Sequence, residues 1–356
     1  MSATKLLMIS TDRKIFEEGS AVRARMVEYG KLFSEIYIVV FAKNTYNPQP
    51  TTHDLSSNVW IYSTNSLSKF FYIFDAIKIS KKILSSTGYK LSPNSYQLTC
   101  QDPFETGLVG WRLAKKNKLP LELQIHTDIG SSYFTSLKLG WRLAFLNSAR
   151  FQLAKFLLPK ADKIRIVSTR IKDFLQYRLK IAEDKMEIRP IKIDEEKIKN
   201  TVVLPEKDLR KKYPQFDFIA LAAGRLEPEK NFALALNVWR EVAKKFPRAG
   251  LVIVGSGSLE KKLKLSTQGG PRKAGQDNVI FEPWTENLTY YYKTSDVFLN
   301  TSFYEGYGLA MAEARFAGLP VISTDVGAVR ELDCEIVGQD IFDIIEKIIS
   351  HISIKH

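Results

Sequence analysis

Two glutamates, Glu305 and Glu313, lie eight positions apart and are separated by Gly306 and Gly308. A strand-like apolar run comes just before them, and the run 309–316 that follows is typical of a helix. Glycines that open a helix directly after a strand leave unpaired backbone N–H groups and a positive helix end at the turn. Such a site suits a phosphate or a sugar hydroxyl, and each glutamate could hold one end of an extended polyol-phosphate ligand. The same pattern also fits a strand–loop–helix unit with two exposed glutamates.

Two loops further upstream carry residues that suit a diphosphate. Gly224 follows an apolar run and can turn sharply, because glycine tolerates left-handed backbone. Arg225 and Lys230 then place two cations on one short loop, where Arg offers a planar fork and Lys a point charge. A later run typical of a buried parallel strand ends at Gly255. Each signal alone also fits solvated surface residues, but their order over residues 218–330 is a much stronger indication.

Taken in order, these motifs resemble those of the retaining, nucleotide-sugar-dependent glycosyltransferases of the GT-B fold, family 4 type (glycosyl transferases group 1). The residues that carry the resemblance are 224–231, 254–257, 305–313 and 317–321. The match is close over about residues 216–330 and loose in the N-terminal half. The resemblance implies an α/β chain with two Rossmann-like, doubly wound domains that face each other across a cleft.

The resemblance also implies roles for four catalytic residues. Arg225 and Lys230 would hold the diphosphate of the donor, and Glu305 would face the donor sugar. His126 follows a strand-like run in the N-terminal half and matches a histidine that contacts the donor sugar in the family. From the residues alone, a single histidine after a strand is more often structural.

Further residues would bind the donor without reacting. Glu313 would accept hydrogen bonds from the ribose hydroxyls, and the segment around Pro283 would lie beside the base. Gly19 lies in the loop after the first strand, where many relatives carry paired glycines and this chain has only one. The complete donor-binding set is Gly19, Gly255, Pro283, Gly306, Tyr307, Gly308, Leu309 and Glu313.

Strand-like and helix-like runs alternate along the chain, which predicts parallel sheets with right-handed crossovers. The predicted boundary is the polar, Lys- and Glu-rich stretch 192–212. We therefore expect an acceptor-binding domain at 1–197, a nucleotide-sugar-binding domain at 198–340 and a C-terminal helix at 341–356. In the N-terminal half we predict strands at 5–9, 35–41, 59–62, 96–100, 121–126 and 163–167, and helices at 21–32, 70–84, 106–117 and 137–158.

The composition of the chain predicts its cellular compartment and its need for a metal or cofactor. Cys100 and Cys334 give no disulfide framework, and no apolar run reaches transmembrane length, so we expect a cytoplasmic protein. No Asp-x-Asp motif stands in a suitable loop. Because Arg225 and Lys230 can replace a divalent ion beside a diphosphate, we expect no metal. We also expect no cofactor; the donor substrate would be a UDP- or GDP-sugar.

The positive charge is confined to one half of the chain. Residues 1–200 hold 32 Lys and Arg against 19 Asp and Glu, whereas residues 201–356 hold 20 of each, so the whole excess of +13 lies in the first half. This charge could attract an anionic partner, or it could serve solubility alone. No nucleic-acid-binding motif is visible, so we expect no nucleic-acid partner.

Two stretches of this basic half, 69–82 and 137–160, mix cations with bulky apolar residues. Amphipathic helices of this kind can lie in the interface of an anionic membrane. They therefore predict an additional, peripheral position on the inner face of the cytoplasmic membrane. The competing interpretation makes Phe71, Trp141 and Phe145 ordinary core residues of crossover helices.

The favoured function is transfer of a sugar, with retention, from a nucleotide-diphosphate sugar to a glycan or lipid-linked acceptor in cell-envelope polysaccharide biosynthesis. Two alternatives stay open. A nucleotide-sugar 2-epimerase, or another GT-B enzyme, would need acid and base groups in the cleft, where only His126 is well placed. A non-catalytic, basic membrane-binding module would leave Arg225 and Glu305 unexplained.

Overall fold

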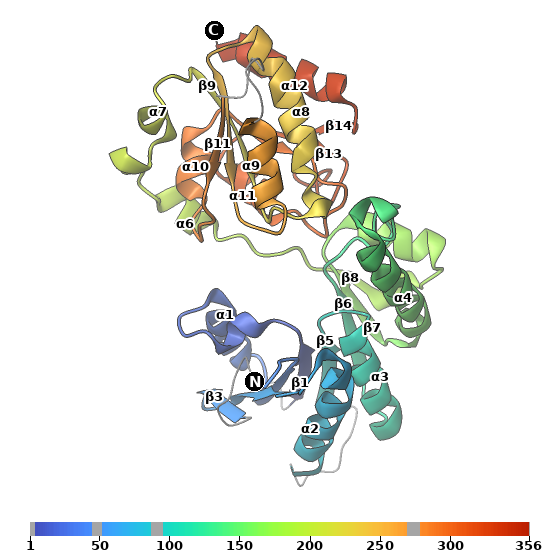
Figure 1. The fold of residues 1–356 in the computed structure, drawn as a ribbon. Helices are drawn as coiled ribbons and strands as arrows, with labels where there is room; N and C mark the ends of the chain where they lie inside the picture. The colour runs from blue at the N-terminus through green and yellow to red at the C-terminus, as the bar shows by residue number, and fades with distance from the viewer. Residues whose placement is uncertain (1–3, 45–51, 87–94, 269–277, 356) are drawn as a thin grey trace. The chain divides into compact units, whose positions relative to one another are not determined.

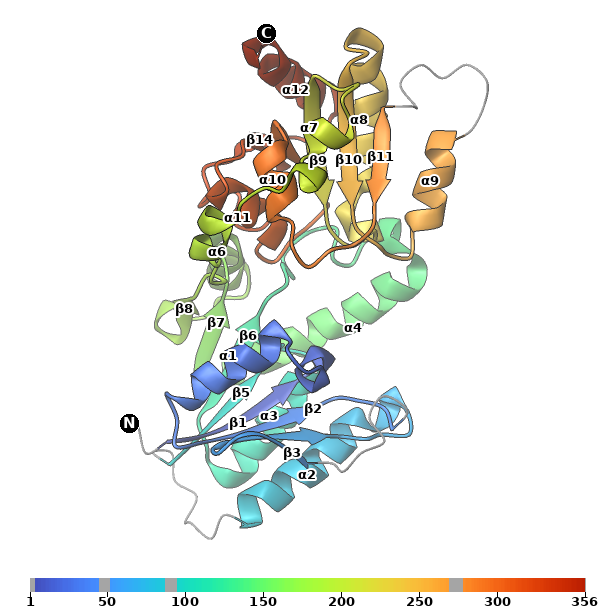
Figure 2. The ribbon, with the colours of Figure 1, turned by 90° about the vertical axis from the view of Figure 1, so that its left-hand side faces the viewer.

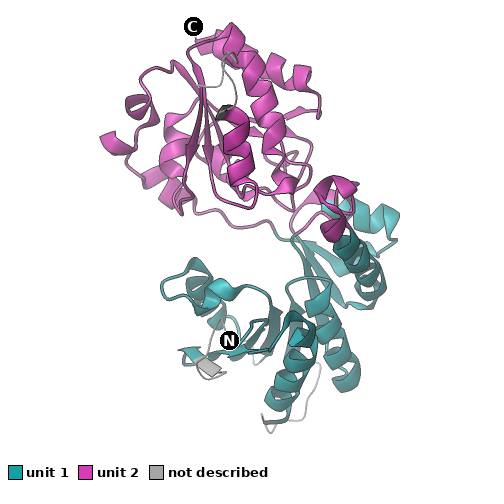
Figure 3. Cartoon of the chain, in the orientation of Figure 1, with its two compact units in different colours: residues 1–126, 145–166, 171–189 teal, residues 127–144, 167–170, 190–356 magenta. Residues whose placement is uncertain are grey.

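The computed structural model describes residues 4–44, 52–86, 95–268 and 278–355. These residues form two compact units, which are coloured separately in Figure 3. Unit 1 comprises residues 1–126, 145–166 and 171–189, and unit 2 comprises residues 127–144, 167–170 and 190–356. Two short segments of the N-terminal half therefore belong to unit 2 by their contacts. The domain boundary at residues 197 and 198 stays a prediction.

Unit 1 is built on an eight-stranded sheet in the order β3-β4-β2-β1-β5-β6-β7-β8. All neighbouring strands are parallel except β3, which runs antiparallel to β4 at the edge. The strands are β1 (Lys5–Ser10), β2 (Glu35–Val40), β3 (Thr52–Ser56), β4 (Val59–Ser63), β5 (Tyr96–Cys100), β6 (Leu121–Ile125), β7 (Lys163–Ile166) and β8 (Met186–Ile188). The six strands predicted here are confirmed, whereas β3 and β8 were not predicted, because β3 is short and largely polar and β8 has only three residues.

Helix α1 covers one face of this sheet, and α2, α3 and α4 lie side by side on the other (Figure 1). The α-helices are α1 (Ala21–Gly30), α2 (Tyr72–Ser86), α3 (Glu105–Asn117), α4 (Trp141–Leu157) and α5 (Thr169–Asp173). The remaining helical turns are η1 (Arg13–Phe16), η2 (Lys69–Phe71), η3 (Leu137–Leu139), η4 (Leu158–Lys160), η5 (Phe174–Arg178) and η6 (Glu183–Lys185). The single helix predicted at 137–158 is interrupted, because Gly140 has a φ of 95° and separates η3 from α4.

Unit 2 contains a six-stranded, all-parallel sheet in the order β11-β10-β9-β12-β13-β14. The strands are β9 (Phe218–Ala223), β10 (Ala249–Val254), β11 (Val279–Glu282), β12 (Val297–Asn300), β13 (Val321–Thr324) and β14 (Glu335–Val337). Every residue of β10 is buried, as is typical of parallel strands covered on both faces. Along β9, Phe218 and Ala220 pack into one core and Ile219 and Leu221 into the other.

Helices α8 and α12 cover the first core of unit 2, and α10 and α11 cover the second. The helices are α6 (Glu195–Asn200), α7 (Leu209–Lys212), α8 (Phe232–Lys245), α9 (Glu260–Gln268), α10 (Thr289–Thr294), α11 (Leu309–Phe316) and α12 (Ile341–Lys355), with short turns η7 (Pro205–Lys207) and η8 (Pro228–Lys230). In α8 the buried residues recur every three or four positions, which gives it one apolar face. Among the helices of the described residues, none is long and apolar enough to cross a lipid bilayer.

Candidate active site

The strand order of unit 2 reverses between β9 and β12, and most of the predicted site residues lie beside this reversal. From β9 the chain proceeds outward through β10 to β11, and from β12 it proceeds the opposite way through β13 to β14. Strands β9, β10 and β11 end on the same edge of the sheet, as Figure 2 shows. In doubly wound sheets, the loops that leave such a reversal at the carboxyl edge diverge and form a crevice that binds ligands.

The first two loops at this edge are locked together by backbone contacts. The Leu226 N–H donates to the carbonyl of Ser256, at 2.9 Å, and Gly224 N–H donates to the carbonyl of Val254, at 3.0 Å. A Cβ atom on Gly255 would lie 2.0 Å from the carbonyl oxygen of Gly224, so no other residue fits at position 255 without moving the backbone. The glycines therefore allow two strand ends to approach closely and fix the loop that carries Arg225 and Lys230.

An ion pair joins the two sides of the reversal. Lys230, after β9, donates to Glu305, after β12, and both side chains are largely buried, with 19% and 13% of their surfaces exposed. The Ser302 hydroxyl lies 2.9 Å from the same Glu305 oxygen. The structure therefore brings together two residues that lie 75 positions apart in the sequence. Arg225 is exposed and pairs with Glu229, at 2.8 Å.

Gly308 ends the loop that follows Glu305 and begins helix α11. Its φ of 88° is left-handed, and a Cβ at this position would lie 2.7 Å from the Met311 side chain. Helix α11 starts at Leu309, as predicted, so the N–H groups of its first turn have no partner inside the helix. The carbonyl of Tyr307 accepts a hydrogen bond from the Ala328 N–H, at 2.9 Å, and this holds the loop against the segment after β13.

Glu313 lies on the second turn of α11 and is held by a residue that we did not predict. The hydroxyl of Tyr292, on α10, donates to Glu313 Oε2 at 2.9 Å. Burial raises the pKa of Glu313, while the hydrogen bond from Tyr292 and the charge of Lys197 lower it. Tyr292 thus fixes Glu313 Oε2, and the other carboxylate oxygen, Oε1, could accept a hydrogen bond from a ligand. Tyr292 occurs in a run of three tyrosines, and nothing in the sequence distinguishes it from its neighbours.

Aromatic side chains of segment 127–144 hold the loop before Glu305, and these were also not predicted. The ring of Tyr133 stacks on that of Phe303 with centroids 4.5 Å apart, and Phe134 meets Tyr304 edge-on at 6.0 Å. Lys138 lies 5.3 Å from the centre of the Tyr133 ring. These contacts lie within unit 2 and link segments separated in sequence by about 170 positions. Such a distance leaves no local sequence pattern.

His126 belongs to unit 1, where it directly follows β6 at the carboxyl edge of the sheet. Burial, followed by the charges of Arg165 and Arg25, lowers its pKa from 6.5 to about 4, so the ring is neutral near neutral pH. His126 Nε2 lies 3.0 Å from the side-chain oxygen of Gln124. The side-chain nitrogen of Gln124 donates to the Thr99 hydroxyl, which fixes the orientation of the amide. Nε2 therefore carries the proton, and Nδ1 is the ring atom that can accept a hydrogen bond.

The remaining predicted residues lie at loops of the two units. Gly19 is an exposed residue of unit 1 with a φ of 75°, just before α1. Pro283 is exposed after β11, on the edge of the unit 2 sheet that also carries Gly224 and Gly255. In unit 2 the structure thus gathers Gly255, Pro283, Gly306, Tyr307, Gly308, Leu309 and Glu313 on the loops and first turns of one sheet edge.

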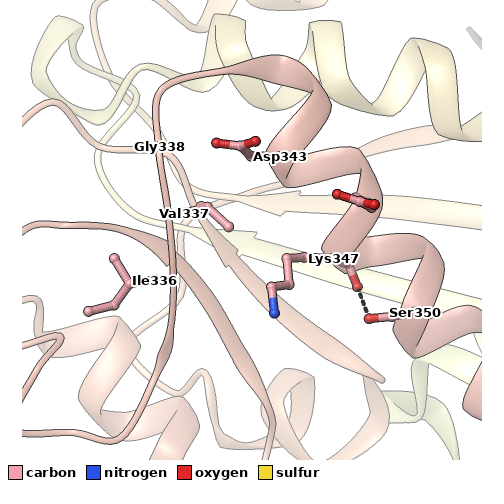
Figure 4. Close-up of a pocket in the computed structure, with 7 residues that line it drawn as sticks. Ile336, Val337, Gly338, Asp343, Lys347 and Ser350 are labelled. Carbon is pink, nitrogen blue, oxygen red and sulfur yellow. Dashed lines mark hydrogen bonds between the residues drawn. The ribbon is translucent and has the colours of Figure 1, made fainter.

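Among the described residues, no group of three or more His, Cys, Asp or Glu side chains is arranged to hold a metal ion. A hollow of about 340 Å³ lies elsewhere in unit 2, between β14 and α12, and is lined by Ile336, Asp343 and Lys347 among others (Figure 4). None of the predicted site residues lines it. This hollow is therefore separate from the candidate site.

Two doubly wound, largely parallel α/β units are the architecture of the GT-B class. Residues 206–337 match the family model of glycosyl transferases group 1. The family match of this segment and the GT-B fold of the chain confirm the resemblance and the predicted fold class.

Two curated relatives and two solved structures illustrate the relationship. An uncharacterized glycosyltransferase of Haemophilus influenzae is 37% identical over 103 residues, which are 29% of this chain and 28% of that protein. The UDP-Gal:alpha-D-GlcNAc-diphosphoundecaprenol alpha-1,3-galactosyltransferase of Escherichia coli is 27% identical over 260 residues, 70% of this chain and 63% of that protein. The aligned part of the chain thus spans less than two thirds of the length of either relative.

Among solved structures, sucrose-phosphate synthase from Thermosynechococcus elongatus has a TM-score of 0.76 and 18% identity, covering 99% of this chain and 90% of that one. Anabaena HepE in complex with UDP-glucose has a TM-score of 0.66 and 15% identity, covering 98% of this chain and 90% of that one. At these identities the likeness shows the fold alone.

We predict that Glu313→Gln and Tyr292→Phe both weaken nucleotide binding, whereas Glu305→Gln mainly lowers turnover. Loss of a charge-assisted hydrogen bond costs roughly 1.5–3 kcal/mol, so Glu313→Gln should weaken UDP or GDP binding about 10- to 150-fold. Because the pKa of Glu313 is raised, its carboxylate gains a proton at a higher pH than an ordinary glutamate does. On acidification, nucleotide binding should therefore begin to weaken at that higher pH. Tyr292→Phe should move this pH upward, since the hydroxyl stabilises the carboxylate.

Calorimetric titration of nucleotide against pH checks this prediction. Unchanged affinity in both Glu313→Gln and Tyr292→Phe would remove the ribose role of Glu313. An unchanged pH midpoint in Tyr292→Phe, together with weakened binding, would reduce Tyr292 to a packing residue.

We predict that His126 contributes no inflection near pH 6.5 to the profile of kcat/KM. Its pKa is lowered to about 4, so its neutral form persists through the pH range in which an ordinary histidine gains a proton. Comparison of the profiles of the wild type and His126→Asn tests this, because asparagine retains a polar side chain that does not titrate. A limb near pH 6.5 that disappears in His126→Asn would contradict a neutral role.

Proposed function

We propose that this protein is a retaining glycosyltransferase that moves a sugar from a UDP- or GDP-sugar to a glycan or lipid-linked acceptor. The observation that carries the proposal is the pairing of Lys230 with Glu305 across the strand reversal, with Glu313 on the helix that follows. Lys230 and the open N-terminus of α11 would meet the diphosphate, with Glu305 at the sugar on one side of it and Glu313 at the ribose on the other, which is the order of these groups in a nucleotide-diphosphate sugar.

The chemistry requires charge stabilisation on both sides of the bond that breaks. Departure of the nucleotide diphosphate places negative charge on the leaving phosphate and positive charge on the anomeric carbon. Lys230, which is largely buried, and the first N–H groups of α11 would stabilise the former where such interactions are strong, and the exposed Arg225 would add a second cation from the same loop. We assign no nucleophilic role to Glu305, because its ion pair with Lys230 suits it to position the sugar.

His126 would contribute an acceptor rather than a charge. With the proton on Nε2 directed at Gln124, its Nδ1 can receive a hydrogen bond from a hydroxyl of the donor sugar. An imidazolium at this point would oppose the positive charge that develops at the anomeric carbon. The lowered pKa of His126 avoids that repulsion near neutral pH.

For the acceptor we propose a lipid-linked or cell-envelope glycan, reached from a peripheral position on the inner face of the cytoplasmic membrane. The curated relative from Escherichia coli named above acts on a diphosphoundecaprenol-linked sugar, as its name states. The excess of positive charge in residues 1–200 suits an anionic surface or acceptor.

The proposal predicts activity that needs Lys230 but survives a chelator. Lys230→Ala should lower turnover at least 100-fold, because removal of one preorganised donor to a developing charge typically costs about 10²–10³ in kcat. Lys244→Ala is the matched control, since Lys244 forms an ion pair with Glu241 at 2.7 Å on the exposed side of α8. The assay follows release of UDP or GDP from a panel of nucleotide sugars in EDTA, with and without added magnesium.

Three outcomes would contradict this account. A strict magnesium requirement would mean that the phosphate site is misplaced. Equal losses in Lys230→Ala and Lys244→Ala would show an effect of general stability rather than catalysis. A product that keeps the nucleotide and changes only the sugar would identify an epimerase.

A further inference from the structure

The segment that leads into helix α2 exposes large apolar side chains to solvent. Within eight residues, Leu67, Phe70, Phe71 and Phe74 are all exposed, and Phe70 and Phe74 expose 95% and 70% of their surface. Soluble proteins usually carry such residues singly, and a cluster of them marks a binding surface. The structure therefore contradicts the interpretation of Phe71 as a core residue, and Trp141 and Phe145 on α4 are exposed as well.

Helix α2 continues this surface with cations. Its buried side includes Tyr72, Ala76 and Ile83, whereas its exposed side runs from Phe74 to three lysines one and two turns later. The lysines of this surface are Lys69, Lys78, Lys81 and Lys82. Within the described part of the chain, none of the four forms an ion pair, and the one acid of α2, Asp75, accepts a hydrogen bond from Ser66. An aromatic tip is thus followed by an unneutralised positive stripe.

The position of this surface within unit 1 is also informative. Helix α2 begins after β4, so its aromatic end lies at the carboxyl edge of the sheet and its last turn lies toward the opposite edge. His126 follows β6 on the same carboxyl edge, because β4 and β6 are both parallel to the central strands. The aromatic tip and a predicted catalytic residue therefore share one edge of unit 1.

We propose that residues 67–74 insert into an anionic lipid bilayer while the lysines of α2 bind its headgroups. The proposal rests on the proposed function, because it names the membrane as the place where a lipid-linked acceptor is met. Charge complementarity favours this occupant: aromatic side chains enter the headgroup boundary and adjacent lysines meet anionic lipid. Each cation near such a surface strengthens binding by roughly fivefold.

A second copy of the chain fits the surface less well. A two-fold interface would bring the lysine stripe of each copy close to that of the other, and protein interfaces are depleted in lysine at their centres. A bilayer that contains phosphatidylglycerol neutralises the same lysines. The charge of the surface therefore favours an anionic bilayer over a second copy of the chain as its binding partner.

Vesicle co-sedimentation of the full chain tests the proposal. Phosphatidylcholine vesicles with and without phosphatidylglycerol are compared at low and high salt, using the double variant Phe70→Ser, Phe74→Ser and the triple variant Lys78→Gln, Lys81→Gln, Lys82→Gln. We expect the wild type to bind only the anionic vesicles, and less at high salt. The double variant should weaken binding at least tenfold, and the triple variant roughly 100-fold.

A matched control removes exposed apolar residues elsewhere. Phe342 and Ile354 on α12 of unit 2 are 74% and 83% exposed, and the variant Phe342→Ser, Ile354→Ser should bind vesicles as the wild type does. All substituted side chains are exposed, so the variants should fold. Nucleotide affinity, measured on the same samples, should be unchanged in each of them.

The outcomes separate this inference from the proposed function. Binding that is absent, indifferent to lipid charge or unaffected by Phe70→Ser, Phe74→Ser would overturn the inference, while intact nucleotide binding and sugar transfer would leave the function standing. A dimer that dissociates in the double variant would assign the surface to self-association. Vesicle binding without any nucleotide binding would support the docking surface and reject the glycosyltransferase.

Discussion

The reversal of strand order between β9 and β12 is the constraint on which the candidate site depends. It separates the loops that leave these two strands, and it does so at the edge where parallel strands present their carboxyl ends. Lys230 and Glu305 come from the two sides of that separation and neutralise each other there. A buried cation or carboxylate without its partner would be costly, so the ion pair is what allows both side chains to lie largely buried at this edge.

The glycines and backbone hydrogen bonds around Lys230 and Glu305 also bring the loops of this sheet edge together. Gly224, Gly255 and Gly308 each adopt a positive φ, and a Cβ on Gly255 or Gly308 would collide with a neighbour. They permit strand ends and a helix start to approach so closely that charged side chains and open N–H groups share one edge. Tyr292 extends the arrangement to Glu313, because this buried tyrosine donates a hydrogen bond that fixes one carboxylate oxygen.

Local features of this protein could be predicted from the sequence, and long-range ones could not. The helix Leu309–Phe316 has the predicted bounds, because a glycine precedes it, Gly318 follows it and its apolar residues recur with helical spacing. The contact of Tyr133 with Phe303 joins segments that share no local pattern, so no inspection of either segment could find it. The sequence likewise left open whether Phe71 and Phe145 were buried, since apolar residues at helical spacing fit both a core and a docking surface.

The central claim is that the edge formed by Lys230, the start of α11 and Glu313 binds a nucleotide diphosphate. A crystal structure of the protein with bound UDP or GDP tests this most directly, because it places phosphate and ribose independently of activity. The account predicts the phosphates within hydrogen-bond distance of Lys230 Nζ and the Leu309 N–H, and the ribose hydroxyls at the carboxylate of Glu313. A nucleotide bound in the hollow between β14 and α12, or bound at the predicted edge with its ribose away from Glu313, would contradict it.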